Sequence, residues 1–443
     1  MQPHDMSKEP AFTPHPLRGR VLAEVHARPF VAFEGSKRFL HFAFLTNQEA
    51  VAKARVALEI FCLERAAPPP APEARHHRVV LSPAILRWEQ HGEFTTYTWE
   101  FPEDAENTPA AGKDTAFRPN ADELAGVMRQ LPQPGPLMVA VDLHFLPETK
   151  AGEIYRHVFS PDQLIAAEVE NQAAMVATDF QPDAFGFVRL LVLDRKLTPN
   201  QAGALTQRLL EVETYRTLAL LGLPEAQEIG PSLRRIETEL PLLMSEMRFS
   251  DGMAANQHLL HRLTALAAEL EAGAAHSAYR FGATRAYHEL MSVRLTSIGE
   301  KAISDLPTLT AFLARRLTPA IRTCLATETR QENLSQKLSR AAQLLRTRVE
   351  IDLESQNGDL LRKMNDRVRL QLQLQQTVEG LSIAAITYYI ASILHLVFEG
   401  LHHGPQEWEL AFDPAFATAA AVPVILAFVT WLVLRIRRHH SED

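Results

Sequence analysis

The chain has 443 residues, of which 46% are hydrophobic, and a formal net charge of −8. This length allows two or three domains with sizeable cores. The acidic balance provides no basic surface of the kind that nucleic-acid binding requires, so we expect no nucleic-acid partner. The two cysteines, Cys62 and Cys324, lack CxxC spacing, which favours a reduced compartment over a disulfide framework.

The first 195 residues mix strand-like and helix-like patterns. Residues 47–65 have helical periodicity, whereas alternating or compact apolar runs predict strands at 38–45, 77–82, 85–90, 93–101, 136–146, 173–180 and 185–194. This mixture predicts an α/β domain over residues 15–195. Within the 136–146 run, alternation places Asp142 and His144 on one face of the strand.

Two capping-box sequences with proline at the first helical position begin at Ser160 and Thr198, and each predicts the start of a helix. A helical region is expected over residues 196–318, with separate helical patterns at about 198–221, 225–247, 252–274, 283–303 and 308–316. It is followed by a long stalk helix over residues 319–379, in which "LQLQLQQ" is interpreted as helix because helical patterns flank it.

A helix of this length needs a packing partner for its apolar face. Its apolar residues recur at helical spacing, at Leu334, Leu338, Ala341, Leu345, Val349 and Leu353. The partner could be the preceding helices of the same chain or the same helix of a neighbouring subunit. We expect both, and therefore a coiled-coil homo-oligomer.

Two segments near the C-terminal end, residues 380–398 and 415–434, contain no Asp, Glu, Lys or Arg. Each has about the 20 residues that a helix needs to cross a bilayer, so they predict a transmembrane hairpin and the lipid bilayer as a partner. The alternative for the first, more polar segment is a buried helix of a soluble protein.

The flanking charges predict the orientation of this hairpin. Basic residues precede the first span and follow the second, namely Arg362, Lys363, Arg367, Arg369, Arg435, Arg437 and Arg438. The connecting loop, residues 399–414, has no Lys or Arg but contains Glu407, Glu409 and Asp413. The positive-inside rule therefore places both termini, including the basic tail 435–443, in the cytoplasm and the acidic loop outside.

Residues 15–30, "HPLRGRVLAEVHARPF", and 348–389, which begin "RVEIDLESQNGDLL", resemble a bacterial family of uncharacterised membrane-anchored proteins, the domain-of-unknown-function 3422 family. The resemblance covers essentially the full chain. It implies a multi-pass protein of the bacterial inner membrane. It supplies no activity, catalytic residue or cofactor.

The predicted order of elements is also similar to that of CorA-type magnesium channels, pentamers whose first span lines the pore. The first span here ends "HLVFEGLHHG", without the Gly-Met-Asn signature of those channels. On a helical wheel, one narrow polar stripe contains Thr377, Tyr388, Ser392, His395 and Glu399. In an oligomer this stripe could line a water-filled path, with the acidic loop concentrating a divalent cation. Alternatively, it packs against residues 424–431 of the second span.

Glu24, His26 and Arg28 occupy alternate positions near the start of the chain. Together they could bind a ligand or partner protein, or they could form a structural network. His258 and His261 have helical spacing but no third ligand nearby, so we expect no metal site. Common nucleotide-binding, hydrolase and zinc motifs are absent, and we expect neither an enzyme nor a cofactor. Two hypotheses follow: a CorA-like ion channel or transporter, and a membrane-tethered scaffold or regulator without transport activity.

Overall fold

A computed structural model of the chain describes residues 15–25, 30–72, 74–102, 130–151, 153–402 and 413–440. The chain divides into two compact units. The first contains Met1–Ser245 and Arg262–Ala341, and the second contains Glu246–His261 and Ala342–Asp443. The N-terminal region is α/β, followed by long helices that end in two apolar helices, as the sequence predicts.

The first unit is built on a mixed nine-stranded sheet with the order β2-β3-β4-β1-β5-β8-β7-β6-β9. β5 and β8 are parallel, and the other neighbouring pairs are antiparallel. The strands are β1 (Lys37–Leu45), β2 (His76–Val80), β3 (Ile85–Gln90), β4 (Phe94–Pro102), β5 (Leu137–Pro147), β6 (Ile165–Val169), β7 (Ala174–Pro182), β8 (Val188–Asp194) and β9 (Lys301–Ala302).

One face of the sheet is covered by α6 (Pro199–Ala219) and by parts of two longer helices, α8 (Met253–Ile298) and α9 (Leu309–His402). α6 begins with the predicted capping box at Thr198. Its apolar face buries Leu205 and Leu209 against strand residues such as Val141. Gly203 allows close approach of another segment, because a Cβ there would lie 2.3 Å from the carbonyl oxygen of Val31.

The opposite face is covered in two halves. α2 (Gln48–Glu64) buries Leu58 and Phe61 against Trp88 and Trp99 of β3 and β4. Two short helices, α4 (Glu148–Ala151) and α5 (Tyr155–Val158), lie at the other half, where Tyr155 packs with residues of β6, β7 and β8. α1 (Arg18–Val25) carries exposed apolar side chains, among them Val21.

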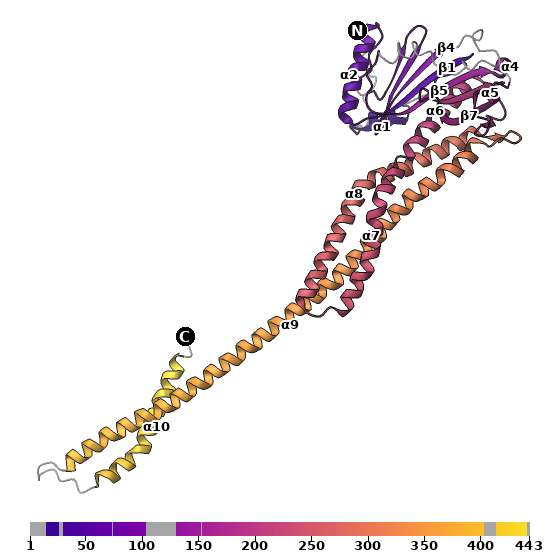
Figure 1. Cartoon of the computed structure of the whole chain (residues 1–443). Helices are drawn as coiled ribbons and strands as arrows, with labels where there is room; N and C mark the ends of the chain where they lie inside the picture. The colour runs from indigo at the N-terminus through magenta and orange to yellow at the C-terminus, as the bar shows by residue number, and fades with distance from the viewer. Residues whose placement is uncertain are drawn as a thin grey trace, which may run out of the picture. The chain divides into compact units, whose positions relative to one another are not determined.

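Away from the sheet, α7 (Gly222–Phe249) packs with α8 and α9 as a three-helix bundle (Figure 1). Ion pairs join its helices: Arg235 with Glu269, Arg330 with Glu237, and Arg285 with Glu328. Inside the bundle, Phe281 and Cys324 pack with Ala226.

The second unit contains the end of α9 and α10 (Pro414–His440). At its start, Asn256 donates a hydrogen bond of 2.9 Å to Asp352. Every residue of α9 from 353 to 378 is then exposed. The predicted apolar face of α9 is buried from Leu334 to Leu345, half-buried at Val349 and exposed at Leu353.

Two sequence expectations require correction. The capping box at Ser160 does not start a long helix: the Ser160 amide donates instead to Asp179, and β6 follows as a strand paired with β7. The helical patterns of the middle region join into fewer, longer helices. α8 is continuous across residues 274–283, and Pro319 lies within α9 rather than at its start.

Candidate functional site

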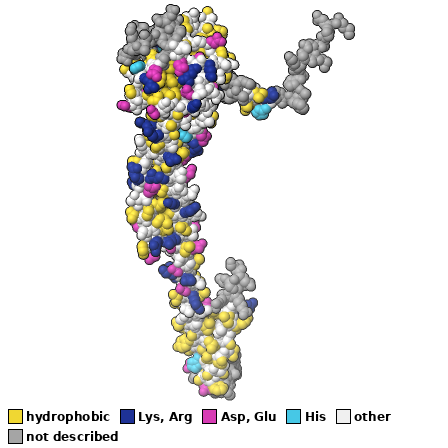
Figure 2. Space-filling model, turned by 90° about the vertical axis from the view of Figure 1, so that its right-hand side faces the viewer, with side chains coloured by type: hydrophobic (Ala, Val, Ile, Leu, Met, Phe, Trp, Pro, Cys, Tyr) yellow, Lys and Arg dark blue, Asp and Glu magenta, His cyan; other side chains and the backbone are white. Residues whose placement is uncertain are grey.

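α9 and α10 pack against each other along one face of each helix. Both are long and apolar enough to cross a membrane, and Figure 2 shows hydrophobic side chains gathered over this hairpin, with few charges among them. Thr387 and Val429 are buried between the helices, at 7% and 3% exposure. The ring of His395 hydrogen-bonds the Thr418 hydroxyl at 3.0 Å.

The hairpin separates the residues of the predicted polar stripe. His395 turns toward α10, whereas Tyr388, Ser392 and Glu399 are exposed on the outer surface of α9. Tyr388 is 70% exposed, and its ring contacts only the neighbouring Tyr389 among the described aromatic side chains. Thr377 is also exposed and donates to the Gln373 carbonyl at 2.9 Å. The alternative in which the stripe packs on the second span therefore applies to His395 alone.

The exposed stripe continues upstream as a longer pattern. Positions alternate by four and three residues through Leu374, Val378, Leu381, Ala385, Tyr388 and Ser392, which we call the α9 seam. Leu374, Val378 and Leu381 are 66%, 57% and 73% exposed. The sequence shows these three residues at the three- and four-residue spacing of a helix, which supports the helical interpretation of "LQLQLQQ", but this row was not joined to the polar stripe that follows it.

The other predicted residues are less fully described. Glu407 and Glu409 lie outside the described residues, whereas Asp413 caps α10 by accepting from the Ala415 amide at 2.9 Å. His26 and Arg28 also lie outside them, as does the side chain of Glu24 in α1. His258 and His261 are exposed on α8, and among the described residues no group of three His, Cys, Asp or Glu could hold a metal ion.

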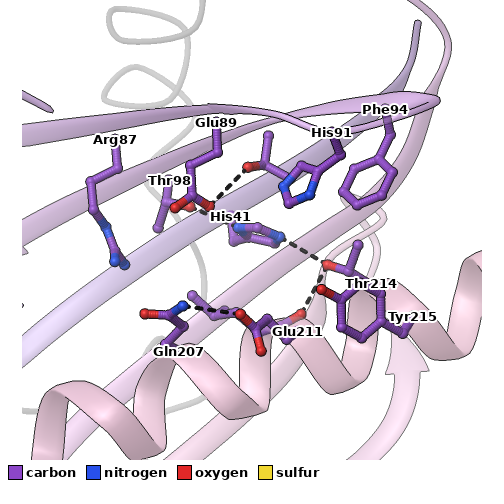
Figure 3. Close-up of a pocket in the computed structure, with 12 residues that line it drawn as sticks. His41, Arg87, Glu89, His91, Phe94, Thr98, Gln207, Glu211, Thr214 and Tyr215 are labelled. Atoms are coloured by element: carbon purple, nitrogen blue, oxygen red, sulfur yellow. Dashed lines mark hydrogen bonds between the residues drawn. The ribbon is translucent and has the colours of Figure 1, made fainter. Parts of the chain in front are cut away.

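A polar pocket between the sheet and α6 is a second candidate site (Figure 3). The register of β3, β4 and β1 places Arg87, Thr98 and His41 in one row across the sheet face. His41 hydrogen-bonds Thr98 at 2.8 Å and Thr214 of α6 at 3.0 Å. Sequence reasoning missed this site because its residues come from distant segments.

Burial determines the charge of the histidine at the centre of this row. Desolvation, followed by the positive charge of Arg87, lowers the pKa of His41 to about 3. The imidazole is therefore neutral at physiological pH. Beside it, Gln207 donates to Glu211 at 3.0 Å, and Glu211 also pairs with Arg294 of α8.

A buried charged network lies on the opposite face of the sheet. Arg38 of β1 holds Asp142 of β5 with two hydrogen bonds of 2.9 Å, and His144 lies 3.2 Å from the same carboxylate. Burial alone would raise the pKa of Asp142, but its contacts with His144 and Arg38 outweigh burial and lower it. The carboxylate is therefore charged and fully paired, which suits a structural role.

Comparison with known proteins identifies a family but no activity. The model of the family described as protein of unknown function (DUF3422) matches residues 13–440. No curated protein matches the chain, and no solved structure does so either. The resemblance carried by residues 15–30 and 348–389 is thereby confirmed over nearly the whole sequence.

Proposed function

The chain belongs to the DUF3422 family, and we propose that it is a membrane-anchored homo-oligomer in which α9 of each copy lines a path for ions. The hairpin of α9 and α10 crosses the bilayer of the bacterial inner membrane. The basic residues before the first span and after the second support an orientation with both termini in the cytoplasm. The layout is that of a CorA-like channel, and the transported ion is a cation, because the outer loop is acidic.

The observation that carries this proposal is the exposure of polar side chains near the middle of the first span. Tyr388 and Ser392 lie on the outer surface of the hairpin, and neither hydroxyl hydrogen-bonds another described residue. Polar groups that face hydrocarbon without a partner cost free energy. Contact with another copy, or with water in a central path, removes this cost.

The α9 seam supports assembly through the same surface. Its spacing is the heptad pattern by which parallel helices interlock. The pattern runs without interruption from apolar Leu374 and Val378, before the span, to polar Tyr388 and Ser392 within it. The α9 seam would therefore join the copies through its apolar residues before the span and supply the polar residues that line the centre of the oligomer within the membrane.

Disulfide trapping tests the assembly. Leu374→Cys should form a disulfide-linked dimer on mild oxidation in membranes, because equivalent seam positions face each other. Leu372→Cys is the matched control, since Leu372 is also exposed, at 51%, but points away from the seam. The native Cys62 and Cys324 are buried. Equal trapping at both positions, or at neither, would contradict the seam.

Ion flux tests the path. The purified full chain in liposomes should conduct Mg²⁺ or K⁺, and Ser392→Leu should reduce the flux at least about tenfold by filling the path with an apolar side chain. Glu399→Ala should reduce cation flux less, because it removes charge at the outer mouth. Trapping at Leu374→Cys without flux of either ion would exclude the channel and favour the scaffold.

The second candidate is a membrane-tethered scaffold or regulator. It is supported by α1, whose Val21 and Leu22 are 63% and 50% exposed, and by Leu17 just before it, which is 52% exposed. These side chains lie next to Glu24, His26 and Arg28 in the sequence. A partner captured by the natural chain but not by Val21→Asp, in a protein without ion flux, would support it.

A further inference from the structure

Two arginines face each other on neighbouring strands, and one of them, Arg87, lines the pocket beneath α6. Arg78 of β2 is directly opposite Arg87 of β3 in the antiparallel register, so both side chains project from the same sheet face. Like charges at such positions destabilise a sheet. Within the part of the chain that the structure describes, neither guanidinium forms an ion pair with a carboxylate. An anion held between them would relieve this repulsion.

Arg87 points into the pocket, above Gln207 and beside His41 (Figure 3). Its Nε is buried and has no hydrogen-bond partner. A buried donor without a partner costs roughly 1–3 kcal/mol, which a ligand oxygen would recover. The guanidinium fork matches two parallel oxygens of a carboxylate or phosphate.

The charges around the pocket favour a ligand group with one negative charge. Glu211 is compensated by Arg294, and the His41 imidazole is neutral. Arg87 and Glu89 line the pocket and Arg78 lies opposite Arg87 on the neighbouring strand, so these three groups together carry a single positive charge. A carboxylate balances it, whereas a phosphate dianion would exceed it.

The volume of the pocket is also compatible with a carboxylate group. The cavity volume is about 30 Å³, room for about two water-sized atoms. The two oxygens of a carboxylate fit this space, with the rest of the acid outside it. We propose that the pocket binds the carboxylate of a small organic acid, with Arg87 as the main ligand and Arg78, opposite it on β2, as a second positive charge. This site is independent of the proposed ion path.

The test uses the full chain in detergent micelles, with acetate as the probe and saturation-transfer NMR of its methyl protons as the readout. Acetate should bind saturably to the natural chain. Arg87→Gln should weaken acetate binding at least about tenfold. Arg87→Lys keeps the positive charge but loses the paired N–H donors of the guanidinium, so its affinity for acetate should lie between those of the natural chain and Arg87→Gln. Arg78→Gln should weaken binding a few-fold, and because Arg78 is exposed this variant tests the site even if Arg87→Gln fails to fold.

Arg156→Gln is the matched control, because Arg156 is an exposed arginine on α5 and should leave acetate binding unchanged. Methylammonium chloride at equal ionic strength should show no saturable binding. The proposal is overturned if acetate does not saturate the natural chain or binds Arg87→Gln within twofold of it. Saturable binding of inorganic phosphate without acetate binding would overturn the assignment to a carboxylate. None of these outcomes depends on ion flux.

Discussion

The two units of the chain differ in how far their side chains are buried. In the first unit even charged residues such as Asp142 are buried and paired, and the apolar residues of its cores, such as Val141 and Trp88, are covered by other parts of the same unit. In the second unit, Leu374 and Leu381 are exposed before and within a span that also exposes Tyr388. The first unit completes its own core, whereas the second leaves large apolar side chains exposed, which on our proposal lipid and further copies cover.

The largest expected effect comes from breaking the buried pairing of the first unit. Arg38→Met leaves the buried Asp142 carboxylate without its main partner, and we expect the free energy of unfolding to fall by about 3–5 kcal/mol. Fluorescence of the buried Trp88 and Trp99 during denaturant unfolding of the full chain reports this change. Arg156→Met, at an exposed ion pair, should change it by less than about 0.5 kcal/mol. Equal effects would show that the network does not support the sheet.

The same substitution at two leucines of α9 sharpens the contrast between the units. Leu338 is fully buried and Leu374 is 66% exposed. Leu338→Ala should lower the free energy of unfolding by about 2–5 kcal/mol, because it leaves a cavity. Leu374→Ala should change it little but reduce oligomerisation, measured by mass photometry in micelles. An unchanged oligomer in Leu374→Ala would remove the main support for the seam.

A smaller effect on the free energy of unfolding is expected from the protonation of His41 as the pH falls. Its pKa is 6.5 in the unfolded chain and about 3 when folded. The unfolded state therefore takes up the proton first, so His41 contributes stability fully above pH 6.5 and loses it as pH falls toward 3. Between pH 6.5 and 4.5 the loss should be about 2–3 kcal/mol.

His41→Gln should flatten this part of the pH profile of unfolding, and His261→Gln, at an exposed histidine, should leave it unchanged. Asp142 does not interfere in this window. Its pKa is lowered on folding from 3.8, so its contribution is lost only in more acidic solution. A profile that keeps its slope in His41→Gln would show that other groups cause it.

The sequence predicts the strands and the apolar helices because both depend on local periodicity. β3 has the predicted bounds, 85–90, and the Thr198 capping box forms as expected. β6 could not be predicted, since the short apolar run after Ser160 becomes a strand only by pairing with β7. Local signals also fail to show that α8 and α9 continue through their expected breaks, because tertiary packing stabilises the joined helices.

The candidate sites depend on contacts between distant segments, which a single sequence does not contain. His41 and Thr214 meet in the pocket although 173 positions separate them. The polar stripe of α9 is visible on a helical wheel, but which of its residues faces α10 depends on how the two helices pack. The wheel alone therefore could not separate His395 from Tyr388 and Ser392.

The position of β9 has a consequence for synthesis of the protein. By residue 194 the nascent chain contains β1 to β8, yet the edge of β6 is still open, because its partners Lys301 and Ala302 follow α8. The apolar face that receives Met291, Ile298 and Leu313 is also only partly covered. Open strand edges and bare apolar faces promote aggregation. While the ribosome completes α7 and α8, we therefore expect the unfinished sheet to be prone to aggregation.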